Sequence, residues 1–155
     1  MKGEMKMKRF LCVLLACLII APSAFAIDVT DFNMYAEIFG GKEITDGVVS
    51  ELDTGVFTEY KANDCKIIFR ETNGSLNTIY VIGEGEPFIL YSCAALMFVD
   101  TKTENASKNM GNFLLGYLMA KGSENSDPHM SQTVSGSLFG VNKEDEGGYM
   151  FMVIK

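Results

Sequence analysis

Two tight-turn signals constrain the fold of this chain more than any other feature of its sequence. Asn63-Asp64 and Asn73-Gly74 each separate stretches rich in β-branched and aromatic residues, and Asn-Gly strongly favours the two-residue turn of a β-hairpin. The sequence therefore predicts three consecutive antiparallel strands, over residues 54–62, 65–72 and 75–83.

Counting outward from these turns assigns each side chain to one face of the sheet, because successive side chains of a strand point to opposite faces. The face that we expect to be the core carries Val56, Thr58, Tyr60, Ala62, Cys65, Ile67, Phe69, Leu76, Thr78, Tyr80 and Ile82. The second face is expected to carry Phe57, Glu59, Lys61, Lys66, Ile68, Arg70, Asn77, Ile79 and Val81.

This second face holds more large apolar residues than a purely solvated face needs. We therefore take Phe57, Ile68, Ile79 and Val81 as candidate binding residues. Three explanations are open for the face: residues 42–53 cover it, a second copy of the chain packs on it as a homodimer, or a partner protein or peptide docks there.

The rest of the chain predicts three helices and two more strands. Apolar residues at helical spacing indicate helices over residues 30–39 and 105–121, and the apolar run 88–100 indicates a third, with a strand at 96–99 as the alternative. Two strands are predicted over 132–142 and 149–155. The order α-βββ-αα-ββ predicts a single α+β domain over residues 27–155. We expect a mainly antiparallel sheet of about five strands, with helices packed on one face.

Residues 1–26 have the pattern of a secretory signal peptide. A basic start with Lys2, Lys6, Lys8 and Arg9 precedes an apolar run from Phe10 to Ala21, and an A-x-A pattern ends at Ala26. We expect cleavage after Ala26 and a periplasmic or secreted protein with no membrane insertion afterwards. The stretch Leu14–Cys17 loosely resembles a lipobox, so a lipoprotein is the alternative.

Removing this segment makes the chain strongly acidic. The remaining residues hold 9 basic and 19 acidic side chains, a formal charge of −10. This charge argues against nucleic acid as a partner, because nucleic-acid binding needs clusters of Lys and Arg. A charged partner is expected to be cationic.

Cys12 and Cys17 leave with the signal, so Cys65 and Cys93 remain. Two cysteines in an exported chain predict one disulfide bond, and both are expected on the helix side of the sheet.

Catalytic motifs are sparse. Asp127 and His129 are the weak candidates for acid–base catalysis, since an Asp two residues before a His can orient it. The single His makes a zinc site improbable, and we predict no metal and no cofactor. We therefore expect a binding module that holds a protein or peptide partner on the mixed sheet face. The alternative is a small extracytoplasmic hydrolase-like enzyme that uses the loop with Asp127 and His129.

Overall fold

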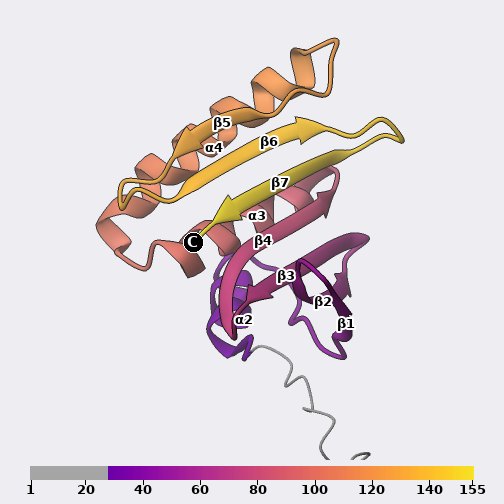
Figure 1. The fold of residues 1–155 in the computed structure, drawn as a ribbon. Helices are drawn as coiled ribbons and strands as arrows, with labels where there is room; N and C mark the ends of the chain where they lie inside the picture. Colours follow the sequence, from indigo (N-terminus) through magenta and orange to yellow (C-terminus); the bar gives the residue numbers. More distant parts are fainter. Residues whose placement is uncertain (1–27) are drawn as a thin grey trace, which may run out of the picture.

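The computed structural model describes residues 28–155, which form one antiparallel sheet with helices against one of its faces (Figure 1). The elements are α2 (Thr30–Ile38), β1 (Val48–Leu52), β2 (Gly55–Ala62), β3 (Cys65–Thr72), β4 (Ser75–Gly83), α3 (Gly85–Val99), α4 (Thr103–Gly122), β5 (His129–Gln132), β6 (Leu138–Lys143) and β7 (Tyr149–Ile154). The strand order in the sheet is β1-β2-β3-β4-β7-β6-β5. The predicted signal peptide lies outside the described residues.

The α+β class is confirmed, but the sheet has seven strands rather than about five. One extra strand is β1, in a polar segment without clear patterning. The other arises because the predicted strand over 132–142 is broken: residues 133–137 form a turn, in which the N–H of Gly136 donates to the carbonyl of Thr133 at 3.0 Å. This turn separates β5 from β6.

The two hairpin turns form as predicted. Asn63 and Asp64 have φ angles of 49° and 62°, and Asn73 and Gly74 have 55° and 73°. Both residues of each turn are thus left-handed, the geometry that matches the twist of hairpin strands. The flanking pairs are Ala62 with Cys65 and Thr72 with Ser75.

A β-bulge then changes the register of β4. Arg70 pairs with Thr78 and Glu71 with Leu76, so Asn77 has no opposite residue on β3. One extra residue turns every later side chain of a strand to the other face. The predicted faces of β4 are therefore wrong beyond the bulge, and Ile79 and Val81 point toward the helices.

The core lies between the sheet and the helices. Phe32 of α2 contacts Phe69 of β3 edge to face, with ring centroids 5.3 Å apart, and Phe113 of α4 contacts Phe151 of β7 in the same way at 5.3 Å. All four rings are fully buried. Burial of one such side chain contributes roughly 1.5–3 kcal/mol, so these contacts anchor α2 and α4 to opposite halves of the sheet.

The helices all lie on one side, behind the sheet in Figure 1, with α4 behind β5 and β6. None of the helices formed by residues 28–155 has the length and apolar character needed to cross a membrane.

Candidate functional site

The sheet face turned away from the helices is the first candidate surface, and we call it the open face (Figure 1). The strand register places on it Val48, Ser50, Leu52, Phe57, Glu59, Lys61, Lys66, Ile68, Arg70, Thr78, Tyr80, Ile82, Met130, Gln132, Leu138, Asn142, Met150, Met152 and Ile154. The alternation is clear in β7, where Phe151 and Val153 are fully buried against the helices and their neighbours on the open face are partly exposed.

The middle of the open face is apolar. Ile68 pairs with Tyr80, which pairs with Met152, so these side chains form one row across β3, β4 and β7. Ile82 and Met150 form the next row, and all five side chains are partly exposed. Methionine is flexible and polarisable, which lets such a surface adapt to different apolar partners.

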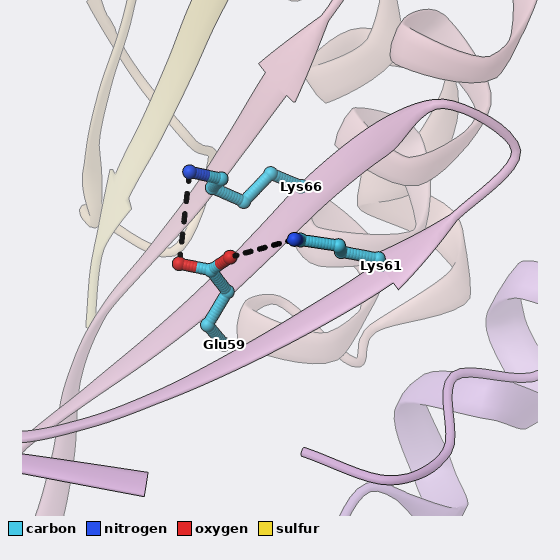
Figure 2. A network of polar contacts seen from close by, with 3 residues as sticks. All are labelled: Glu59, Lys61 and Lys66. Carbon is cyan, nitrogen blue, oxygen red and sulfur yellow. Dashed lines mark ion pairs between the residues drawn. The ribbon is translucent and has the colours of Figure 1, made fainter. Parts of the chain in front are cut away.

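The part of the open face formed by β2 and β3 carries most of its basic residues, and we call this part the positively charged end. Glu59 accepts ion pairs from Lys61 at 3.9 Å and Lys66 at 3.6 Å, and the Lys61 side chain is 79% exposed (Figure 2). Exposed pairs of this kind contribute little to stability. One carboxylate thus faces two ammonium groups, and a net positive charge remains here on a chain that is acidic overall.

Arg70 adds a third cation to this end. Its guanidinium group lies 5.8 Å from the centroid of the Phe57 ring, and its Nη2 donates to the carbonyl of Thr54 at 2.8 Å. The cation–π contact and this hydrogen bond hold Arg70 over Phe57. Charged and apolar groups are therefore interleaved at this end.

Residues 42–53 do not cover the open face. Ile44 is buried with the core and hydrogen-bonds Asn33 of α2, and the carbonyl of Lys42 accepts a bond of 3.0 Å from the Tyr91 hydroxyl of α3. Residues 48–52 then form β1 at the sheet edge. The segment packs on the helix side and extends the sheet, so the first explanation for the mixed face is excluded.

The candidate binding residues divide between the two faces. Phe57 and Ile68 lie on the open face as expected, whereas Ile79 and Val81 are fully buried in the core. The bulge at Asn77 is the reason, and it brings Tyr80 and Ile82 to the open face instead. Tyr80 and Ile82 are thus surface residues that the sequence analysis placed in the core.

The weak catalytic candidates are not brought together. Asp127 is exposed in a loop, where its Oδ2 accepts a 3.0 Å hydrogen bond from Asn125. His129 begins β5 and lies against Gly116 of α4, and its buried Nε2 has no hydrogen-bond partner among the described residues. His129 lines a groove of about 280 Å³ between α4 and β5 together with Asn112, Leu115, Gly116, Met119, Pro128, Met130 and Ser131. No carboxylate lines this groove.

The predicted disulfide is not formed. Cys65 and Cys93 are both free and buried, and burial raises the pKa of each thiol to about 11. Both lie in the layer between the sheet and the helices, as expected, but the α3 residue whose pKa the charge of Cys65 raises is Tyr91, not Cys93. Cys93 follows Tyr91 by two residues, which is a rotation of about 200° around the helix axis. The side chain of Cys93 therefore points away from the direction of Tyr91, and the two sulfurs do not meet although both lie in the same layer.

One buried carboxylate is held by neutral donors. Asp100, 3% exposed at the end of α3, accepts hydrogen bonds from Asn105, from Asn109 at 2.9 Å and from the Ser135 hydroxyl at 2.8 Å. Burial acts to raise the pKa of Asp100, but these hydrogen bonds outweigh it and lower the pKa to about 2. Asp100 therefore stays ionised and ties the turn between β5 and β6 to α4.

An acidic hollow of about 460 Å³ lies where Asp64, Glu84 and Glu146 approach the glycines of the β6–β7 turn. Across residues 28–155, no group of three or more His, Cys, Asp or Glu side chains is placed to hold a metal ion. The hollow thus adds to the acidic character of the surface, in contrast with the positively charged end of the open face.

Comparisons with protein-family models, with curated proteins and with solved structures found no match to this chain.

Proposed function

We propose that the protein is an exported interaction module whose open face binds a partner protein or peptide that carries acidic and apolar residues. The observation that supports this proposal is the composition of that face. Large apolar side chains in its middle are partly exposed to solvent, and nothing among residues 28–155 packs over them. An uncovered apolar surface of this kind on a folded domain favours an interface.

The charge of the face supports an acidic partner. Lys61, Lys66 and Arg70 stand against the single carboxylate Glu59 on this face, although acidic residues outnumber basic ones along the chain. Partners recognise the local potential of the surface that they contact. For this face we therefore replace the cationic partner expected from the net charge with an acidic one.

Two alternatives fit the open face less well. A second copy placed face to face would bring two clusters of cations into one interface. Residues 1–27 contain four basic and one acidic side chain, so this segment also has the wrong sign for the positively charged end. The enzyme alternative loses support because Asp127 and His129 have separate surroundings.

A binding assay with two designed peptides tests the proposal. One peptide alternates Leu with Glu and the other alternates Leu with Lys, and isothermal titration calorimetry measures their affinity for the protein. We expect the Leu/Glu peptide to bind, and Lys66→Glu to weaken it by about 10-fold through the reversed charge. Equal binding of the Leu/Lys peptide, or no binding of either, would refute the proposed partner chemistry.

A matched pair of variants locates the binding surface. Ile68→Asp places a charge in the apolar middle of the open face and should abolish binding while the circular dichroism spectrum and melting curve stay normal. Leu114→Asp makes the same kind of change on α4, on the opposite side of the sheet, where the side chain is 40% exposed. This control should bind normally. Ile79→Asp is unsuitable because Ile79 is fully buried and the substitution should unfold the protein.

Export is a separate part of the proposal. Amino-terminal sequencing of the protein recovered outside the cytoplasm should give Ile27 as the first residue, whereas a lipid-modified Cys17 would establish the lipoprotein alternative.

A further inference from the structure

We propose that β5 and the exposed ridge of α4 form a homodimer interface, in which the β5 strands of two copies pair antiparallel and continue the sheet. This interface lies at the β5 edge of the sheet, away from the apolar middle of the open face, and Met130 is the one residue used below that belongs to both surfaces. It does not depend on the proposed partner, and the argument for it rests on three features of that edge.

The first feature is an unpaired strand next to exposed apolar side chains. β5 is the last strand of the sheet, so one row of its backbone N–H and C=O groups has no partner strand. Beside it, Leu115 and Met119 of α4 are 59% and 52% exposed, and Met130 of β5 is 49% exposed. These residues line the groove between α4 and β5. A free strand edge beside an apolar groove is the arrangement that added strands recognise.

The second feature is the absence of charge. The stretches 109–120 and 128–142, which supply the outer part of α4 and all of β5, contain no Asp, Glu, Lys or Arg. The chain without its predicted signal carries a formal charge of −10, so two copies repel each other over most of their surfaces. Two copies can meet at this edge without bringing like charges together, and this favours a second copy as the occupant.

The opposite edge of the sheet lacks this property. β1 also has exposed apolar residues, with Val48 70% and Leu52 63% exposed. However, Glu51 lies within β1, and Asp46 and Asp53 flank it. A symmetric pairing of β1 with itself would bring these carboxylates together, so the uncharged edge is the one that we assign to the dimer.

The third feature is the unpartnered nitrogen of His129 in the wall of the groove. In an antiparallel pair, residues directly opposite each other point to the same face. A two-fold axis through Met130 would place Ser131 of the second copy opposite His129, on the helix side of both sheets. The Ser131 hydroxyl of the second copy then lies beside His129. Because the ring nitrogen is enclosed within one chain, it gains this hydroxyl as a partner when the imidazole turns toward the β5 edge.

This geometry has a simple consequence for α4. A two-fold axis perpendicular to the sheet keeps both helix layers on the same side, so the two α4 helices lie next to each other. Asn112, Leu115 and Met119, spaced three and four residues apart, form one stripe along the helix that faces the partner. The two open faces then lie side by side on one continuous sheet.

Sedimentation equilibrium over a range of protein concentrations tests the dimer. The wild-type protein should sediment with twice the mass of one chain, and Leu115→Glu should raise the dissociation constant roughly 100-fold by placing two carboxylates in the interface. The matched control is Leu52→Glu at the opposite edge, where the leucine is 63% exposed, and this variant should remain dimeric. Circular dichroism verifies that both variants are folded.

Hydrogen exchange of the β5 amides gives an independent readout. The β5 amides that point away from β6 should exchange slowly at high protein concentration and faster on dilution or in Leu115→Glu, because pairing protects the edge of the strand. A wild-type protein that stays monomeric at every concentration in the sedimentation series overturns the proposal. The proposal is also overturned if Leu52→Glu disrupts the dimer, or if hydrogen exchange in β5 does not change with protein concentration.

Discussion

Replacing Asp100 with Asn tests whether a buried charge without a cation contributes to stability. The carboxylate of Asp100 accepts hydrogen bonds from the amide nitrogens of Asn105 and Asn109 and from the hydroxyl and N–H of Ser135. An amide has the same shape but only one accepting oxygen, so its NH₂ group would face donors. We expect Asp100→Asn to destabilise the protein by about 2–3 kcal/mol at pH 7.

The pH dependence follows from the pKa of the carboxyl group. A pKa of 3.8 in the unfolded chain and about 2 in the folded protein corresponds to about 2.4 kcal/mol. Asp100 lies next to exposed Thr101 and Ser135, and screening by nearby water reduces this to about 1.5 kcal/mol. Since the folded pKa is the lower one, the stabilisation is complete above pH 3.8 and is lost as the pH falls toward 2.

Urea unfolding followed by circular dichroism at pH 7, 5 and 3 measures the free energy of unfolding of both proteins. The difference between wild type and Asp100→Asn should be equal at pH 7 and 5 and smaller at pH 3. Asp127→Asn is the matched control, because Asp127 is exposed, and it should change stability by less than about 0.5 kcal/mol. Equal stability of wild type and Asp100→Asn at pH 7 would refute the reasoning.

Two further predictions concern glycines and thiols. Gly55→Ala should destabilise the protein by about 2 kcal/mol in a thermal melt, because Gly55 has φ +140° and an added Cβ would press on the carbonyl oxygen of Glu71. Gly111→Ala, in α4 with no atom within 4 Å of the added Cβ, should instead stabilise it by up to about 1 kcal/mol, and the opposite order would contradict this account. Cys65 and Cys93 should resist iodoacetamide at pH 8 in the folded protein and both react after unfolding, because burial raises the pKa of each to about 11. A disulfide between them in a peptide map without reductant would show this prediction to be wrong.

Local sequence signals predicted the hairpins but could not locate the bulge. Asn63-Asp64 and Asn73-Gly74 determine their turns through their own backbone preferences, so their positions follow from a few residues. In β4, however, the set Ile79 and Val81 and the set Tyr80 and Ile82 are both apolar. Either set could face the core, and the bulge at Asn77 determines which one does.

The missed strand β5 has a similar explanation. Residues 129–132 are His-Met-Ser-Gln, with little β-propensity, and they become a strand because β6 pairs with them. The predicted face was therefore correct for Phe57 and Ile68, whose strands are bounded by clear turns. It failed for Ile79 and Val81, whose side chains are oriented by tertiary contacts.

The position of β7 in the sheet also determines when this chain can fold. β7 comes after every other described element in the chain, yet it lies between β4 and β6, and its Phe151 and Val153 are fully buried. The meander β1–β4 and the hairpin β5–β6 therefore cannot join into one sheet until β7 has been synthesised. This topology delays closure of the core until β7 has been made, so most of the chain leaves the ribosome before the sheet can close.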